Sequence, residues 1–414
     1  MIKGLLWVFL LLFGAFLVQY GFCAYGWVTP PPIAEITDRE GERLSADETT
    51  VHLLGDPNGN VPKTMLAYYE EKVFSYQLLS GGYGGYRATR KARLTLSASL
   101  QRAAQAALRE YRGTVAVMNY ETGELLCAVS TPSFAPDGKG EAAEGMFVNR
   151  FLQGLYTPGS IYKLVTLAAT LEEMPDAQTQ VFSCDGQQFF GGDKVTCPVP
   201  HGEQSLKDAF RNSCNCAFAT LATELGEEKM TAYAAKFGLT ASIAFDGFAT
   251  AKGRYDSAVS LPWSGVGQGD CKINPCAFLT FLSAVARDGQ VVNPYLMASV
   301  SVGGRRVYKA KTTLGGKILS PQTAHILKDY LSYSAEKYFC DPPLCAKTGT
   351  AEVGAEKPNA MLCGFLKESD TPYAFLIIAE NAGSGSAVCL PILQTLLRQS
   401  LPCVKGGGKN PFDF

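Results

Sequence analysis

The sequence predicts an α+β fold built on a mainly antiparallel sheet, with flanking helices and a helical middle region. A helical segment followed directly by two β runs opens the pattern, and strand-like runs followed by a helix close it. A doubly wound parallel sheet would require repeated βαβ units, and the sequence contains none.

The predicted elements follow one another in a definite order. Residues 99–111 have apolar side chains at helical spacing, and residues 114–128 form two β runs around a Glu-Thr-Gly turn. The remaining elements are helices at 160–174, within 205–225 and at 387–399, and strands at 344–352 and 373–380.

Composition places the chain among folded globular proteins with an added apolar segment. Hydrophobic residues make up 47% of the 414 residues and charged residues 18%. The 37 basic and 38 acidic residues leave a net charge of −1, so no basic excess is available to neutralise phosphates. We therefore expect no nucleic acid partner.

The N-terminal segment is strongly apolar. Residues 4–34 carry no charged side chain, and residues 5–18 are almost wholly apolar, with Lys3 before them and the interface-type aromatics Tyr25 and Trp27 after them. About 20 apolar residues suffice to span a bilayer. We expect residues 1–28 to form an uncleaved anchor that leaves the rest of the chain outside the cytoplasm; a cleaved signal peptide and a lipoprotein modified at Cys23 are the alternatives.

The rest of the chain divides into three parts by composition. The stiff stretch from Thr29 to Pro32 opens a polar, turn-rich segment, which we interpret as a short stalk over residues 29–93. Residues 94–404 carry the predicted sheet and helices and form one domain. The glycine-rich residues 405–414 are predicted to be a mobile tail.

The chain has 13 cysteines, several of them close together in sequence. That spacing allows disulfides, and the odd total leaves at least one thiol without a partner in the chain. A zinc site would call for paired Cys-x-x-Cys units or histidine companions, and neither pattern is present, so we expect no metal. Most of the cysteines are predicted to be small buried hydrophobic residues. The neighbouring pairs are Cys184/Cys197, Cys214/Cys216, Cys271/Cys276 and Cys340/Cys345.

The common serine-hydrolase and nucleotide motifs are missing. The three histidines, His52, His201 and His325, lie in unrelated segments, and no Gly-x-Ser-x-Gly elbow accompanies them. No phosphate-binding loop of the Gly-x4-Gly-Lys-Ser/Thr type is present either.

Ser160 and Lys163 offer a different nucleophile and base. If Ser160 begins a helix, the two residues lie at i and i+3 on one face, where the amine can reach the hydroxyl. The helix N-terminus offers free N–H groups to a developing oxyanion. The apolar residues 164–167 supply the burial that lowers the pKa of a lysine enough for it to act as a base. Alone, a Ser-x-x-Lys match is weak.

Two later segments supply complementary groups. Ser213-Cys214-Asn215 begins a helix-like stretch and offers a hydroxyl for proton relay and an amide for a peptide carbonyl. In the strand-like run at Lys347-Thr348-Gly349-Thr350, alternation places Lys347 and Gly349 on one face and the two threonines on the other. The glycine leaves room for a substrate backbone, and the lysine and threonines can bind a carboxylate.

Ser-x-x-Lys, Ser-x-Asn and Lys-Thr-Gly, in this order, resemble the three active-site motifs of penicillin-binding proteins and serine β-lactamases. The resemblance is to class B penicillin-binding proteins and covers roughly residues 94–399, and residues 36–41 resemble the segment that follows the anchor in such proteins. The chain departs from the family pattern in three places. It has Met361-Leu-Cys-Gly364 where aromatics are frequent, Cys214 in the middle of the second motif, and a short stalk that lacks room for a docking surface of larger relatives. Further matching segments are 94–101, 113–134, Asn149-Arg150, Tyr156 to Ser160, 267–269 with Pro275, and 350–352.

The resemblance implies a fold, a reaction and a set of residue roles. The fold is the penicillin-binding transpeptidase domain with a helical subdomain. The reaction is peptidoglycan D,D-transpeptidation from D-Ala-D-Ala stem peptides through a Ser160 acyl-enzyme, which β-lactams also acylate. It implies no cofactor or metal, and a polytopic glycan polymerase as partner. Catalysis falls to Ser160, Lys163, Ser213 and Lys347, and substrate binding to Asn215, Thr348, Gly349 and Thr350.

Other functions stay open at this point. A D,D-carboxypeptidase or a β-lactamase would use the same catalytic motifs, but the anchor and the class B flanking segments favour a transpeptidase. From a different class, a non-catalytic β-lactam sensor would need a signalling domain across the membrane, and a scaffold would be expected to lack a catalytic residue.

Overall fold

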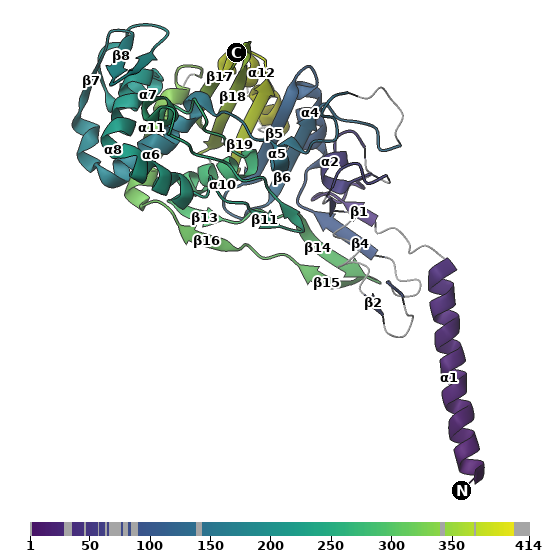
Figure 1. Cartoon of the computed structure of the whole chain (residues 1–414). Coiled ribbons are helices and arrows are strands. Elements are labelled where there is room, and N and C mark those ends of the chain that lie inside the picture. The colour runs from purple at the N-terminus through teal and green to yellow at the C-terminus, as the bar shows by residue number, and fades with distance from the viewer. Residues whose placement is uncertain are drawn as a thin grey trace.

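The computed structural model describes most of the chain (Figure 1). The described residues are 2–28, 35–44, 47–56, 58–62, 64–65, 76–77, 82–83, 90–137, 143–339, 344–367 and 370–400. The predicted mobile tail and part of the predicted stalk, together with Cys340, lie outside these residues.

A five-stranded sheet forms the centre of the domain, in the order β17-β18-β19-β5-β6. Every neighbouring pair is antiparallel, as the sequence predicted. The two β runs around the Glu-Thr-Gly turn are one edge of this sheet, and the Lys-Thr-Gly segment is the other edge. The strands are β5 (Arg112–Asn119), β6 (Leu125–Thr131), β17 (Leu344–Val353), β18 (Glu356–Leu366) and β19 (Tyr373–Glu380).

Helices cover both faces of this sheet, which explains why β5, β6 and β19 are buried along nearly their whole length. Alternate residues of β5 enter different cores: Val115 and Val117 pack with α4 (Ala98–Leu108) and α12 (Gly385–Ser400), whereas Ala116 and Met118 face the helical layer. The expected helices at 99–111 and 387–399 are therefore confirmed. In Figure 1 the helical layer lies to the left of the sheet.

The helical layer carries the first two motifs. The helix predicted at 160–174 begins as a 3-10 turn, η1 (Gly159–Tyr162), and continues as α6 (Lys163–Glu173). The stretch 205–225 is broken into two helices, because residues 212–214 form a turn between them. The other elements of this layer are α5 (Arg150–Gln153), η2 (Pro175–Thr179), α7 (Leu206–Arg211), α8 (Asn215–Lys236), α9 (Leu261–Gly265), α10 (Pro275–Ala286) and α11 (Pro321–Ala335).

Two small hairpins extend beside the helical layer, before the second motif. One pairs β7 (Val181–Cys184) with β10 (Gly202–Ser205), and the other pairs β8 (Gln187–Phe190) with β9 (Asp193–Thr196). We call residues 181–205 the β finger. Its end leads directly into α7 and the Ser-Cys-Asn turn.

A second sheet joins the N-terminal segment to the domain. It has the order β1-β4-β14-β15, and the β1–β4 pair is parallel. Ile36 and Leu54, from the segment predicted to be a stalk, belong to the main core. The sequence did not predict this pairing. The elements are β1 (Glu35–Thr37), β4 (Arg90–Leu94), β14 (Met297–Val302) and β15 (Arg305–Lys309), with α2 (Val51–Leu54) beside them.

The remaining elements are short or lie at the periphery. Three two-stranded pairs complete the fold: β2 (Tyr76–Gln77) with β3 (Gly82–Tyr83), β11 (Ala244–Phe245) with β12 (Phe248–Ala249), and β13 (Gln290–Val292) with β16 (Leu314–Lys317). The N-terminal segment forms α1 (Ile2–Val28), which extends away from the domain in Figure 1. No helix among the described residues is both long enough and apolar enough to cross a membrane.

Candidate active site

Ser160 lies at the start of the helix that carries Lys163, as the sequence predicted. The preceding Gly159 has a positive φ of 53° and donates its N–H to the carbonyl oxygen of Gly267 at 2.8 Å. A Cβ atom at Gly159 would lie 2.8 Å from the carbonyl oxygen of Thr350 on β17. Only glycine tolerates both conditions, so this residue allows the serine turn to pack directly against the Lys-Thr-Gly strand.

The Lys163 amine is buried among polar atoms of the first two motifs. Its Nζ lies 2.9 Å from Ser160 Oγ, 2.8 Å from the Ser213 carbonyl oxygen, 3.1 Å from Ser213 Oγ and 2.7 Å from Asn215 Oδ1. An ammonium has three protons to donate, fewer than these four partners. A neutral amine can instead donate to the carbonyl and amide oxygens and accept a proton from a serine hydroxyl.

Burial changes the protonation of this lysine. The side chain is fully buried, and burial lowers the pKa of Lys163 from 10.5 to about 8, because the charged form loses its hydration. The predicted burial by the apolar residues after Lys163 is present, since Leu164, Val165 and Leu167 are all inaccessible to solvent. The group is therefore suited to accept the Ser160 proton.

Ser213 connects the two lysines of the site. Its Oγ lies 3.1 Å from Lys163 Nζ and 3.1 Å from Lys347 Nζ. The residue has a positive φ of 56°, which is uncommon for a residue other than glycine, and it occupies the turn between α7 and α8. This turn brings the hydroxyl between two amines that lie 184 residues apart in the sequence, at positions 163 and 347.

The Lys-Thr-Gly strand forms the other wall. Lys347 and Gly349 are buried, Thr348 is half-buried and Thr350 is exposed, which matches the predicted alternation. Lys347 Nζ also donates to the Thr348 carbonyl oxygen at 2.9 Å, and Tyr338 holds Thr348 through a hydroxyl contact of 3.0 Å. Burial, followed by the nearby positive charge of Lys163, lowers the pKa of Lys347 well below its ordinary value.

These groups open onto one cleft with a volume of 830 Å³. The two lysines are buried behind its wall, so the structure brings together all eight residues that the sequence selected, six of them at the cleft surface. The lining residues are Ser160, Thr196, Cys197, Pro198, Val199, His201, Asn212, Ser213, Asn215, Trp263, Val266, Gln268, Lys337, Tyr338, Thr348, Gly349, Thr350, Glu352 and Ser386.

Sequence reasoning missed the part of the cleft that the β finger supplies. Cys197 Sγ accepts a hydrogen bond from the backbone N–H of Asn215 at 3.1 Å, and Asn215 Nδ2 donates to the carbonyl oxygen of Thr196 at 2.7 Å. The separations of 12, 3 and 12 residues between Cys184, Cys197, His201 and Cys214 match no local motif, so no sequence signal predicted this wall. The ten cysteines whose side chains the structure describes are free thiols.

His52, one of the histidines excluded as a catalytic base, lies outside the cleft lining. Its Nε2 lies 2.7 Å from the carbonyl oxygen of Met146, and burial lowers its pKa to about 4. The amine of Lys163, and no histidine, lies within hydrogen-bond distance of Ser160 Oγ among the described residues.

Comparison with known proteins assigns the fold and motifs to one family. A family model described as the penicillin binding protein transpeptidase domain matches residues 113–398. The chain belongs to this family. The matched region contains all three motifs and the central sheet apart from Arg112, and the expected membership of the class B penicillin-binding proteins is confirmed.

The penicillin-binding transpeptidase resembles curated proteins from several bacteria. Peptidoglycan D,D-transpeptidase PbpA of Mycolicibacterium smegmatis is 29% identical over 335 residues, covering 70% of this chain and 67% of the relative. Peptidoglycan D,D-transpeptidase MrdA of Escherichia coli is 25% identical over 452 residues, covering 91% of this chain and 69% of the relative. These similarities extend well beyond the three motifs.

Solved structures share the fold. PBPA from Mycobacterium tuberculosis matches with a TM-score of 0.77 and 21% identity, over 90% of this chain and 100% of that one. PBP2 from Pseudomonas aeruginosa matches with a TM-score of 0.77 and 22% identity, over 92% of this chain and 99% of that one. The predicted penicillin-binding transpeptidase fold is therefore confirmed.

Proposed function

We propose that this protein is a peptidoglycan D,D-transpeptidase that works through a Ser160 acyl-enzyme. One observation carries the proposal: the buried amine of Lys163 lies 2.9 Å from Ser160 Oγ, and burial lowers the pKa of Lys163 to about 8. A serine activated by a neutral lysine is a nucleophile suited to acyl transfer. The names of PbpA and MrdA describe this same reaction.

In the acylation step, Ser160 Oγ attacks the carbonyl carbon of the penultimate D-alanine while Lys163 Nζ takes the hydroxyl proton. The backbone N–H groups of Ser160 and Thr350 would hold the oxyanion, since the serine turn packs directly against β17. As the peptide bond breaks, Ser213 Oγ passes a proton from the lysine side of the site to the departing amine. The products are an ester on Ser160 and free D-alanine.

The remaining residues bind and orient the donor peptide. Asn215 offers its amide to a peptide carbonyl, and Thr348 and Thr350 offer hydroxyls to the terminal carboxylate beside the Lys347 amine. Gly349 was expected to leave space for the substrate backbone, but a Cβ there would lie 2.9 Å from Ile161 Cγ2, so its missing side chain instead lets the serine turn pack against the strand. An amine from a second stem peptide then attacks the ester, returns the proton through Lys163 and forms the cross-link. β-Lactams present a similar carbonyl and acylate the same oxygen.

The test is mass spectrometry of the full chain after brief exposure to benzylpenicillin, with the adduct followed over hours. We expect one stable penicilloyl group on Ser160, absent from Ser160→Ala and present in the matched control Ser332→Ala, because Ser332 lies on α11 outside the cleft lining. Rapid loss of the adduct would indicate a β-lactamase. No adduct at all would favour a non-catalytic scaffold.

Stem-peptide turnover distinguishes the two remaining enzyme activities. A transpeptidase should release D-alanine from a D-Ala-D-Ala donor faster when an acceptor amine is added, and should yield a dimeric peptide. Release that leads only to hydrolysed donor would indicate a D,D-carboxypeptidase.

We propose further that residues 1–28 anchor the protein in the cell membrane, with a segment at 29–93 and a catalytic domain at 94–404 outside the cytoplasm. The apolar run at residues 5–18 supports the anchor. A polytopic glycan polymerase is the proposed partner, since the chain also resembles a component of a peptidoglycan synthase complex described as coordinating polymerization and crosslinking. Its TM-score is 0.66 at 23% identity, over 78% of this chain and 64% of that one.

A further inference from the structure

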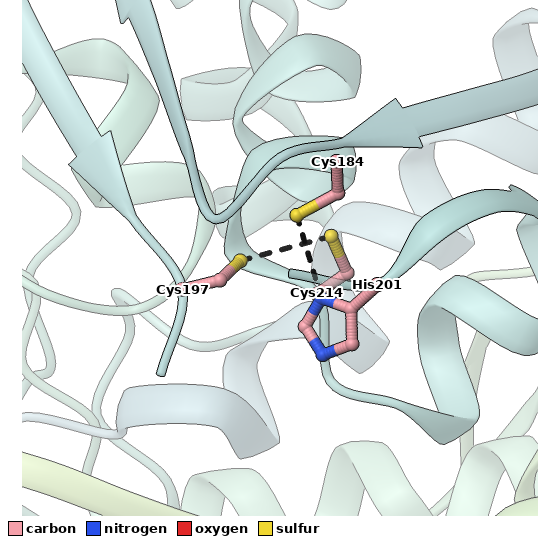
Figure 2. Close-up of side chains that lie close together, drawn as sticks. All are labelled: Cys184, Cys197, His201 and Cys214. Carbon is pink, nitrogen blue, oxygen red and sulfur yellow. Dashed lines mark hydrogen bonds between the residues drawn. The ribbon is translucent and has the colours of Figure 1, made fainter. Parts of the chain in front are cut away.

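Four side chains that could bind a metal converge where the β finger meets the second motif. Cys184 ends β7, Cys197 follows β9, His201 precedes β10, and Cys214 is the residue before α8. Figure 2 shows the three sulfur atoms and the imidazole pointing toward one another. The four donor atoms all lie within 4.8 Å of one another.

Two of the donor–donor distances within this cluster match those of a tetrahedral zinc site. Zinc–sulfur bonds of about 2.3 Å and zinc–nitrogen bonds of about 2.0 Å give tetrahedral edges of about 3.8 Å between sulfurs and about 3.5 Å between sulfur and nitrogen. Cys197 Sγ and Cys214 Sγ are 3.8 Å apart, and Cys184 Sγ and His201 Nδ1 are 3.4 Å apart. A disulfide would instead require about 2.05 Å between two sulfurs.

The backbone holds the donors in place independently of any ion. His201 donates its N–H to the Cys184 carbonyl oxygen at 2.9 Å, and Cys197 donates its N–H to the Gly186 carbonyl oxygen at 2.8 Å. Backbone N–H groups also point at two of the sulfurs: Asn215 N–H at Cys197 Sγ at 3.1 Å and Ala217 N–H at Cys214 Sγ at 3.5 Å. Such N–H donors to ligand atoms orient and support a metal site.

A fourth thiol, that of Cys216, lies close by but is directed elsewhere. Cys216 Sγ is 3.7 Å from Cys197 Sγ, and it points at the carbonyl oxygen of Val195 at 4.0 Å. Three thiolates and one imidazole already fill the four positions that zinc prefers, and soft sulfur ligands favour zinc over magnesium or calcium.

We propose that Cys184, Cys197, His201 and Cys214 bind one structural zinc ion. Binding replaces the thiol protons, which are released to solvent, and no bond or oxidation state changes otherwise. With four protein ligands the ion has no open position for water, so it takes no part in the chemistry. The expectation of a metal-free chain came from local spacing, whereas the four ligands meet only in the folded structure.

The ion would connect the β finger to the second catalytic motif. Cys214 is the central residue of Ser213-Cys214-Asn215, and Asn215 accepts a hydrogen bond from Lys163 at 2.7 Å. Asn215 also donates to Thr196, the residue before Cys197, at 2.7 Å. Zinc would therefore hold the turn in which Ser213 adopts its positive φ. This part of the inference rests on the proposed function, because its readout is acylation.

The first test measures the zinc content of the purified full chain by plasma mass spectrometry. We expect about one zinc ion per chain in the wild type and at least about tenfold less in Cys184→Ala and His201→Ala. Cys389→Ala is the matched control, because Cys389 is equally buried but lies on α12 in the other core. Zinc that is absent from the wild type, or retained in both ligand variants, would overturn the proposal.

A second measurement uses the wild type alone, so it does not depend on the folding of any variant. The zinc is removed with a chelator under reducing conditions and replaced with Co²⁺, whose absorption reports the ligands. We expect the bands of a tetrahedral site with thiolate ligands. The proposal would be overturned if the chain takes up no Co²⁺ while its thiols are free. It would also be overturned if the mass of the purified chain is lower by the two hydrogens lost in a disulfide.

The third measurement compares benzylpenicillin acylation of the chelated and zinc-reloaded wild type. We expect about a tenfold slower acylation without zinc and recovery on reloading. Equal acylation rates with and without zinc would refute the connection between the ion and the second motif. The measured zinc content would still show whether the four residues bind zinc. If no form is acylated, the proposed function fails, and the metal content still tests this inference.

Discussion

Lys163 should make acylation depend on pH in a way that its ordinary pKa would not allow. Burial lowers the pKa of Lys163 from 10.5 to about 8. At pH 7 the Lys163 amine is then neutral in about one molecule in eleven. With the ordinary pKa it would be neutral in about one molecule in three thousand. The gain of about 300-fold in the reactive form corresponds to about 3.4 kcal/mol, at 1.36 kcal/mol per pH unit.

The assay is the second-order rate constant for acylation by benzylpenicillin, measured by mass spectrometry from about pH 6 to about pH 9 and corrected for spontaneous hydrolysis of the drug. We expect the rate to rise about tenfold per pH unit below pH 8 and to level off above it, because only the neutral amine accepts the Ser160 proton. Lys163→Arg should lower acylation by about 10²–10⁴-fold and abolish the inflection, since arginine stays charged.

The control is Lys229→Met, which removes an exposed lysine on α8 and should leave the profile unchanged. A flat wild-type profile over this range would refute the assignment of Lys163 as the base. So would an unaltered inflection in Lys163→Arg.

The same pKa has a consequence for stability. The folded state has the lower pKa, so between about pH 8 and about pH 10.5 the unfolded state binds more protons, and the free energy of unfolding should rise with pH through this window. Three further changes test the site and its support. Ser213→Ala should slow acylation about 100-fold or more, because the hydroxyl lies 3.1 Å from both lysines, while the urea midpoint changes little. Gly159→Ala should lower both acylation and thermal stability, by about 1–3 kcal/mol from the positive φ of 53°. Arg150→Met should destabilise the fold by about 3–5 kcal/mol in urea unfolding, because its buried guanidinium lies 2.9 Å from the Glu380 carboxylate.

Matched control variants separate these effects from a nonspecific loss of stability caused by any substitution. Gly192→Ala is the control for Gly159, since a Cβ at Gly192 meets no atom within 4 Å. Arg109→Met is the control for Arg150, because the Arg109–Glu110 pair is solvent-exposed. Equal stability losses in a variant and its control would contradict the structural reason given. Normal acylation by Ser213→Ala would show that the relay is not needed.

Most of the secondary structure was predictable because its signals are local. The strand predicted at residues 373–380 coincides with β19, and the helix predicted at 99–111 differs from α4 by a few residues at its ends. Apolar residues recur with the helical or strand period wherever one face is buried. The pairing of β4 with β14 had no such signal, because contact between residues about 200 positions apart leaves no periodic trace in one sequence.

The cysteine residues show the same limit. The sequence placed Cys184 and Cys197 near each other, and Cys214 beside Cys216, and it suggested disulfides or buried thiols. In the folded chain, hairpin pairing of β7 with β10 and the turn before α8 bring three of these sulfurs around His201. Ligand convergence depends on how the β finger folds back, and local spacing does not report that.

The sequence by itself predicted Ser160 as the nucleophile and Lys163 as the base, because a separation of three residues at a helix start places both side chains on one face. It also determined the alternation that exposes Thr350 and buries Lys347. Only the tertiary structure decided that Lys163 is fully buried, that Ser213 lies between two lysines and that three cysteines surround a histidine. Burial and electrostatic environment depend on atoms from distant segments, and they set the pKa of Lys163 and hence the chemistry.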